Sequence, residues 1–235
     1  MKIQLKKLPV LFVISIISLS LKTNQPESIR IEFSGLAQGT TWHLAYYATD
    51  TIVTKSQIDS IFLVIDSSLS IYKPYSRIVA FNNSKSGIKT DEHFRKVAEK
   101  SLDTYKQTNG LFDITILPLV EAWGFGAKAF KSIPDSATIR SLISCVSSEF
   151  LQLKKDQLIK LKPCVKIDVN GIAQGYSVDV ITDFLAGSGV NNYIVEVGGE
   201  IRVRGKKQPD NASFKIGIEA PSDDDPDHAP IEKII

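Results

Sequence analysis

Hydrophobic and polar residues alternate in two runs near the start of the chain, residues 30–33 and 42–47. Residues 35–41, which contain two glycines, separate the two runs. A two-residue period places alternate side chains on opposite faces of a strand, and glycines favour a turn. The pattern therefore predicts a β-hairpin over residues 30–47.

Three later segments space their hydrophobic residues three and four positions apart, as one face of a helix does. Thr54 and Gln57 have the spacing of a capping box before the first segment, and Asp135 stands where it can cap the third. Gly110 is placed to end the second helix. The three stripes are Ile58, Ile61, Phe62, Ile65 and Leu69; Phe94, Val97, Ala98, Leu102 and Tyr105; and Ile139, Leu142, Ile143 and Val146.

The rest of the chain predicts short strands around one long helix. Gly198 and Gly199 lie between two of the predicted strands, as in a tight hairpin. Hairpins mixed with strand–helix units favour an α+β fold over a purely parallel sheet. The predicted elements are strands over residues 150–153, 158–161, 165–169, 193–197, 201–204 and 214–218, and a helix over 173–185.

Residues 1–24 are read as a targeting segment and not as part of the fold. Three lysines within the first seven residues precede about fourteen mostly apolar, uncharged residues, 8–21. That length is typical of a signal peptide and short for a membrane span, which needs roughly 20 residues. The alternative is an uncleaved membrane anchor, which would attach the protein to a membrane through its N-terminus. Both interpretations predict an exported protein, periplasmic or held at the outer face of the inner membrane.

Composition excludes several classes of protein. Lys and Arg total 28 and Asp and Glu total 26, so the net charge of +2 gives no support for nucleic-acid binding. Hydrophobic residues make up 43% of the chain, enough for a buried core. The two cysteines, Cys145 and Cys164, exclude a disulfide-dense scaffold. A single disulfide stays open in an oxidising compartment, but we expect both cysteines to be buried apolar residues.

Two of the segments that could bind a ligand lie in the first third of the chain. The glycine turn over residues 38–42 leaves backbone N–H groups free and lets a ligand approach the main chain. The loop over residues 69–82 carries Tyr72, which could stack on a planar ring or simply pack on Pro74.

Two further candidate segments contain an aspartate next to apolar residues. Asp113 lies within residues 110–115, and its carboxylate could bond a ligand or only cap a turn. Asp168 ends a predicted strand before a glycine and a helix, a geometry that suits a phosphate at a helix N-terminus. This last segment has neither the Lys-Ser/Thr of a Walker loop nor the third glycine of a dinucleotide fingerprint.

Taken in order, the four segments resemble those of the ApbE family, the FAD:protein FMN transferases. The resemblance covers about residues 30–220 and includes the Gly198–Gly199 hairpin. It implies an α+β, T-fold-related domain of mixed sheets with packed helices over residues 25–235. It also implies an exported enzyme that binds FAD as substrate, needs Mg²⁺ and releases AMP. The FMN would be joined to a Thr or Ser of an acceptor flavoprotein subunit, typically in a membrane electron-transfer complex.

The resemblance also implies site residues. Asp168 matches a carboxylate that binds the nucleotide or acts in catalysis, and Gly171 matches a backbone carbonyl that faces the metal. Gln174 takes a place where relatives often carry Lys or Glu, so it supplies no charge. The implied FAD-binding residues are Gln38, Gly39, Thr40, Tyr72, Leu111, Phe112, Asp113, Asp168 and Gln174.

One family segment has no counterpart in this sequence. Relatives continue into a His-x-x-Asp-Pro-x-Thr-Gly segment whose Asp and Thr bind the metal, and none occurs before Ile235. No closing element is expected after the Asp- and Pro-rich loop at 221–230, so the domain is read as C-terminally incomplete, either a fragment or a natural short form. Two alternatives to the transferase therefore stay open: an FAD pyrophosphatase that uses water, and a non-catalytic flavin-binding protein.

Overall fold

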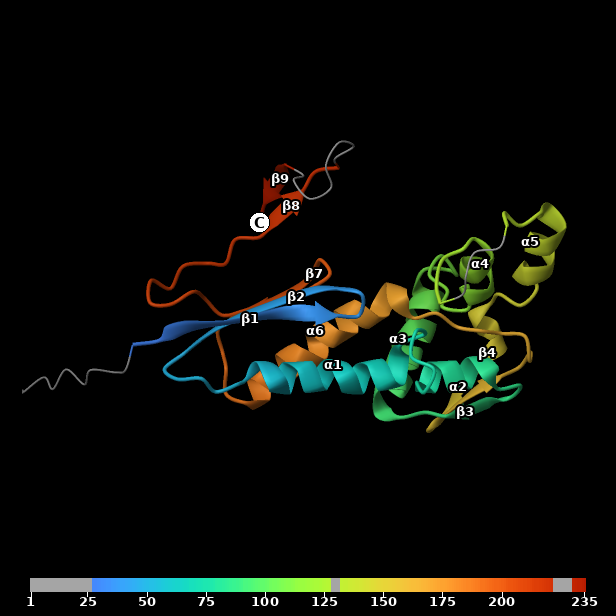
Figure 1. Cartoon of the computed structure of the whole chain (residues 1–235), viewed down its shortest axis with the longest axis horizontal. Helices are drawn as coiled ribbons and strands as arrows, with labels where there is room; N and C mark the ends of the chain where they lie inside the picture. The colour runs from blue at the N-terminus through green and yellow to red at the C-terminus, as the bar shows by residue number, and fades with distance from the viewer. Residues whose placement is uncertain (1–26, 128–131, 222–229) are drawn as a thin grey trace, which may run out of the picture.

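The computed structural model describes residues 27–127, 132–221 and 230–235. The targeting segment over residues 1–24, and most of the loop at 221–230, lie outside these described residues. Figure 1 shows an elongated molecule with two halves, each with its own sheet, joined by two long helices. None of the helices among the described residues is both long and apolar enough to cross a bilayer.

The first half, called the large-sheet half, contains a four-stranded antiparallel sheet in the order β1-β2-β6-β7. Both hairpins predicted from the sequence are confirmed. Their two-residue turns have positive φ at both positions, 52° and 77° at Gln38 and Gly39 and 57° and 92° at Gly198 and Gly199. Such turns match the twist of the paired strands. The strands are β1 (Ile29–Ala37), β2 (Thr40–Ala48), β6 (Tyr193–Val197) and β7 (Glu200–Arg204).

Helices α1 (Lys55–Leu69) and α6 (Asn170–Gly187) pack against one face of this sheet. The predicted capping box at Thr54 and Gln57 is present. The apolar stripe of α1 is divided between two cores. Its first half joins the core under the large sheet, and its last turns join the second core. The largest buried side chains of the first core are Trp42, Leu44, Tyr46, Ile58, Ile181 and Leu185.

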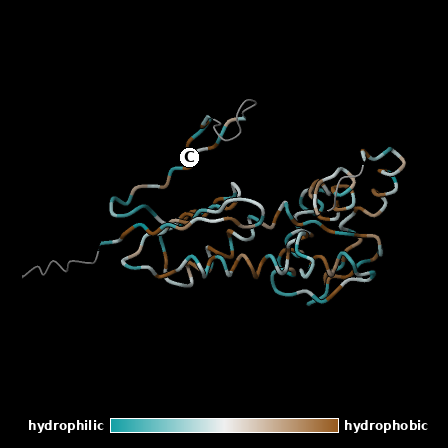
Figure 2. Tube along the Cα trace, viewed as in Figure 1, coloured by the Kyte–Doolittle hydropathy of each residue, from teal (hydrophilic) through white to brown (hydrophobic). Residues whose placement is uncertain are grey.

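The second half, called the small-sheet half, packs α2 and α3 with a three-stranded sheet in the order β3-β5-β4. Figure 2 shows hydrophobic residues interspersed with polar ones along the chain in both halves. The buried residues of this second core include Leu69, Phe81, Phe94, Leu158 and Ile167. Its elements are α2 (Arg77–Asn83), β3 (Gly87–Lys89), α3 (Glu92–Gln107), α4 (Leu117–Ala122), α5 (Ser136–Ile143), the 3₁₀ turn η1 (Ser148–Phe150), β4 (Leu151–Lys154) and β5 (Gln157–Lys160).

The strand predicted over residues 165–169 is wrong in one respect. Its alternate residues are buried as expected, but the segment belongs to no sheet and makes only an isolated parallel bridge, Ile116 to Lys166. A side chain takes the place of a neighbouring strand, because the Asn82 amide bonds both backbone groups of Ile167. The two-residue period therefore predicts the burial of this segment correctly and its pairing in a sheet incorrectly.

The expectation that Cys145 and Cys164 are buried apolar residues is wrong. They form a disulfide with Cα atoms 5.7 Å apart, and neither residue is buried. The bond joins the loop after α5 to the segment that leads into α6. The α5 helix itself has the predicted Asp135 cap, but none of its residues is buried.

The end of the chain also differs from the expectation. Residues 231–234 form a strand, β9 (Ile231–Ile234), so an element does follow the predicted loop. It pairs with β8 (Gly217–Glu219), which is shorter than the strand predicted over residues 214–218. Figure 1 shows this hairpin lying apart from the four-stranded sheet.

Candidate functional site

A cavity of about 550 Å³ lies where the two halves meet. Three elements line it: the β1–β2 turn, the end of α1 with the loop that follows, and the first turns of α6. Four of the residues implied by the resemblance are among the lining residues, and they come from positions more than 130 residues apart. The lining is Gln38, Gly39, Asp66, Leu69, Ser70, Tyr72, Lys73, Asn170, Ala173 and Gln174.

Gln38 ties the β1–β2 turn to α6. The hydroxyl of Ser177 donates to the Ala173 carbonyl at 2.8 Å, so its oxygen is left to accept. Gln38 Nε2 donates to that oxygen at 2.8 Å, which fixes the orientation of the amide. Gln38 Oε1 is buried and has no hydrogen-bond partner among the described residues. The side chain therefore holds one wall of the cavity in place.

Asp66 and Lys73 line the cavity and were not among the residues singled out from the sequence. Burial raises the pKa of Asp66, while the charge of Lys73 and a hydrogen bond from Gln38 act in the opposite direction. The sequence does contain a signal for Asp66. This residue follows Ile58 and Phe62 at four-residue steps, so it places a charge on the buried face of α1.

Tight packing brings the β6–β7 turn against the same cavity wall. A Cβ at Gly198 would lie 2.9 Å from Thr40 Cγ2 and 3.0 Å from Gln174 Nε2. With φ at 57° as well, this position favours glycine for both its conformation and the close approach. Thr40 and Gln174, two of the implied residues, therefore lie next to each other.

A second cavity of about 680 Å³ adjoins the first across the β1–β2 turn. The two share Gln38, Gly39, Asp66 and Lys73 as a common wall. Leu36 and Leu63 add exposed apolar side chains to the second cavity.

Asp113 does not line either cavity. Its carboxylate accepts four hydrogen bonds: from the backbone N–H and the hydroxyl of Thr115, and from the same two groups of Ser148. These bonds fasten the turn after α3 to η1, which matches the turn-capping alternative for this residue. Leu111, beside it, is 92% exposed. Phe112 points toward α6, where its ring lies 3.6 Å from the place of a Cβ on Gly171.

Asp168 lies at the entry to α6. Its backbone N–H donates to the Ile114 carbonyl at 2.7 Å, and its carboxylate accepts from the Asn170 N–H at 2.8 Å. Burial raises the pKa of Asp168; the negative charge of Glu121 adds to the rise, and the bond from Asn170 opposes it. The fold thus brings Asp168 beside the 113–115 turn and two residues from Asn170 in the cavity wall.

Side chains that bind metals do not form a cluster in the part of the chain that the structure describes. The described residues include no group of three or more His, Cys, Asp or Glu side chains that could hold a metal ion. Magnesium prefers an octahedral set of oxygen ligands, usually including one or two carboxylates. The role of the Gly171 carbonyl as a metal ligand, which the resemblance implies, stays a prediction.

Comparison with known proteins gives one family and several relatives. Residues 38–235 match the ApbE family. The chain is 30% identical over 202 residues to an FAD:protein FMN transferase of Vibrio cholerae, covering 83% of this chain and 60% of the relative. It is 31% identical to the enzyme of the same name from Haemophilus influenzae, covering 87% and 63%. The chain therefore spans somewhat under two thirds of the length of these relatives.

A solved structure agrees in fold. The flavin transferase ApbE from Vibrio cholerae superposes with a TM-score of 0.80 and 29% identity, covering 88% of this chain and 68% of that one. The α+β fold expected from the sequence is confirmed.

Proposed function

Because the chain belongs to the ApbE family, we propose that it binds FAD and transfers FMN to an acceptor flavoprotein. A Ser or Thr hydroxyl of the acceptor attacks the phosphorus of the FMN moiety. The bond between the two phosphates breaks, AMP leaves, and the hydroxyl proton ends on AMP or in solvent. Such a transfer needs positioning and charge stabilisation more than covalent chemistry from the enzyme.

The observation that carries this proposal is the first cavity. Gln38, Gly39, Tyr72 and Gln174 line it together, although the sequence separates them widely. In the proposed complex, the ring of Tyr72 stacks on the flavin, and the ammonium group of Lys73 offsets negative charge on the phosphates. The N-terminus of α6 faces the same cavity through Asn170 and favours an anion.

Magnesium dependence and export belong to the same proposal. The resemblance implies Mg²⁺, which when bound would offset negative charge on the phosphates. The described residues contain no group of three or more His, Cys, Asp or Glu side chains that could hold it. The disulfide between Cys145 and Cys164 supports export, because disulfides persist in oxidising compartments such as the periplasm. The acceptor is proposed to be a subunit of a membrane electron-transfer complex, with the N-terminus cleaved or left as an anchor.

The test is intact-mass spectrometry of an acceptor flavoprotein subunit after incubation with the full chain, FAD and Mg²⁺. We expect the acceptor mass to rise by that of FMN less one water, with an equal amount of AMP released. Chelation with EDTA should abolish both. FMN and AMP release without acceptor modification would replace the transferase by an FAD pyrophosphatase. FAD binding with no turnover would instead support the other alternative, a non-catalytic flavin-binding protein.

A further inference from the structure

The segment that carries Asp168 is buried but has little backbone pairing of its own. Val165 and Ile167 are fully buried, yet the segment lies in no sheet. On one side, the Asp168 N–H bonds the Ile114 carbonyl, and Lys166 bridges Ile116. A buried peptide group that lacks a ladder must find another partner, since leaving it unpaired costs about 1–3 kcal/mol.

Asn82, at the end of α2, supplies that partner on the other side. Its Nδ2 donates to the Ile167 carbonyl at 2.9 Å, and its Oδ1 accepts from the Ile167 N–H at 2.8 Å. A primary amide has the donor and acceptor of a peptide group, so one side chain replaces one rung of a ladder. Ile167 is the residue immediately before Asp168, and 85 positions separate it from Asn82.

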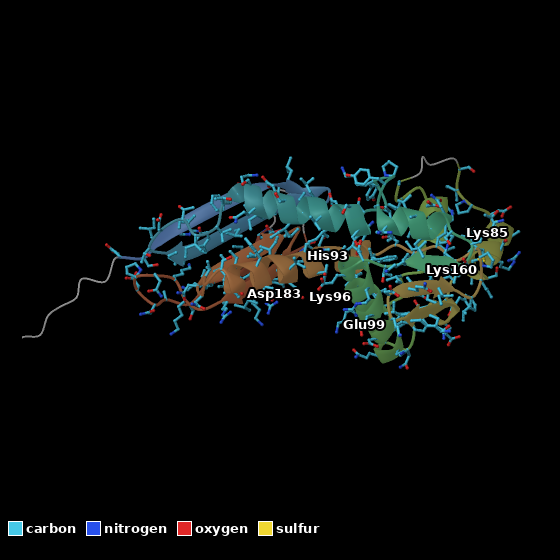
Figure 3. All side chains as sticks on the ribbon, turned by 90° about the horizontal axis from the view of Figure 1, so that it is seen from below. Lys85, His93, Lys96, Glu99, Lys160 and Asp183 are labelled. Atoms are coloured by element: carbon cyan, nitrogen blue, oxygen red, sulfur yellow. A yellow bond between two sulfur atoms is a disulfide. The ribbon has the colours of Figure 1, made fainter. Side chains whose placement is uncertain are left out.

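Asn82 is itself held in place by Lys160 on β5, labelled in Figure 3. The Lys160 ammonium donates to the carbonyls of Asn82, at 3.3 Å, and Ser84, at 2.8 Å. It also lies 4.7 Å from the centre of the Phe81 ring, and the residue is only 5% exposed. A cation bonded to the last carbonyls of a helix is favourable, so Lys160 stabilises the C-terminal end of α2.

We propose that Asn82 is a positioning residue for Asp168: it holds the Ile167 peptide, and thereby sets where the Asp168 carboxylate stands at the entry to α6. This inference rests on the proposed function and on the role at the bound nucleotide that the resemblance implies for Asp168. Neither Asn82 nor Asp168 is among the lining residues of the two cavities, but Asp168 is two residues from Asn170, which lines the first. We therefore expect Asn82 to act on the site through the segment that carries Asp168. A displacement of about 1 Å at a reacting group can lower a rate about 100-fold, so this hold matters for turnover.

The first test is a double-mutant cycle on FAD turnover with Asn82→Ala, Asp168→Asn and the double variant. Asn83→Ala is the matched control, because Asn83 is the exposed neighbour on the same helix. We expect Asn82→Ala to lower kcat by roughly 30- to 100-fold and to change the Kd for FAD less than about threefold. The double variant should be no slower than Asp168→Asn alone. Additive losses in the double variant would overturn the proposal, because they would show that Asn82 acts independently of Asp168.

The second test uses the conservative variant Asn82→Asp. The ionised Asp side chain has no donor for the Ile167 carbonyl, and the two negative oxygens repel each other. The protonated side chain can make both of the original hydrogen bonds. Relative to wild type, turnover should therefore recover as the pH falls below the pKa of the introduced carboxyl. A loss of activity that is the same at every pH would count against the proposal.

The third test needs no activity. Hydrogen–deuterium exchange at the amides of Ile167 and Asp168 should be at least about tenfold faster in Asn82→Ala than in wild type or Asn83→Ala. Protection elsewhere in α2 and α6 should be kept. Unchanged exchange at these two amides would overturn the inference. If wild type does not turn over FAD, the proposed function fails, and this measurement still decides whether Asn82 holds the segment.

Discussion

The two halves of the molecule are stabilised in different ways. In the large-sheet half, hairpins with two-residue turns and an apolar core under the sheet hold neighbouring strands together. The small-sheet half has an apolar core as well, and long-range polar bonds and a disulfide also join its segments, as at Asn82 and Asp113. The cavity lies between the halves, so its shape depends on both kinds of stabilisation. The following predictions test this difference, from the largest effect to the smallest.

Asp113→Ala should cause the largest loss of stability. It removes the acceptor of four hydrogen bonds and leaves the N–H and hydroxyl groups of Thr115 and Ser148 without it. Both of those residues are buried, so we expect the free energy of unfolding to fall by about 3–4 kcal/mol in urea denaturation. Asp103→Ala, on the exposed side of α3, should cost less than about 0.5 kcal/mol.

A different outcome for Asp113 would restore its implied role in the site. If the Ala variant loses FAD binding while its free energy of unfolding changes by less than about 1 kcal/mol, the carboxylate serves the ligand and not the fold.

Removing the disulfide should weaken the small-sheet half selectively. The bond closes a loop between positions 19 apart, so the double variant Cys145→Ser, Cys164→Ser should lose about 3 kcal/mol. Urea denaturation with and without a reductant measures this, and the reductant should have no effect on the variant. Hydrogen exchange should speed up around residues 145–168 and stay slow in β2 and β6. Equal acceleration in both halves would contradict the comparison.

Lys160 should make stability depend on pH. Burial, with some repulsion from Lys166, lowers its pKa from the ordinary 10.5 to about 8. The unfolded chain therefore binds more protons between these two values, and the free energy of unfolding rises as the pH increases from about 8 to 10.5. We expect a rise on the order of 2 kcal/mol in wild type and in the exposed control Lys85→Met.

The variant Lys160→Met should lack this rise, which urea denaturation across the same pH range would reveal. A rise of the same size in Lys160→Met would show that another group titrates.

Tyr72→Ala should have the smallest effect on stability and a clear effect on binding. The side chain is 57% exposed and lines the cavity, so the Kd for FAD should rise about tenfold with an unchanged free energy of unfolding. Tyr75→Ala is the matched control, because Tyr75 is 68% exposed on the same loop and lies outside the cavity lining. Equal Kd values for the two variants would remove Tyr72 from the site.

The large-sheet half was readable from the sequence because its signals are local. The alternation along β1 and β2, the capping box at Thr54 and the Gly198–Gly199 turn each involve residues a few positions apart. The helix expected over residues 173–185 likewise lies within α6.

In the small-sheet half, the sequence predicts α3, β4 and β5, but it does not predict the contacts that join distant residues. Nothing local in the sequence pairs Asn82 with Ile167, Asp113 with Ser148 or Cys145 with Cys164. For that reason the sequence predicts a paired strand over residues 165–169 and two buried cysteines, and the structure shows neither.

The site shows the same division. The resemblance implies four residues of the cavity: Gln38, Gly39 and Tyr72, which lie in a turn and a loop, and Gln174, which lies near the start of α6. The sequence analysis does not identify Asp66, because it considers only the hydrophobic residues on that face of α1. A charged residue on such a face is the signal that would have found it.

The most direct test of the account is hydrogen–deuterium exchange of the full chain with and without FAD. Because the cavity is lined by three separate segments, we predict that FAD slows exchange in residues 38–41, 69–73 and 170–174 together. Slowed exchange elsewhere with none in these three segments, or no change with FAD at all, would contradict the assignment of the cavity as the FAD site.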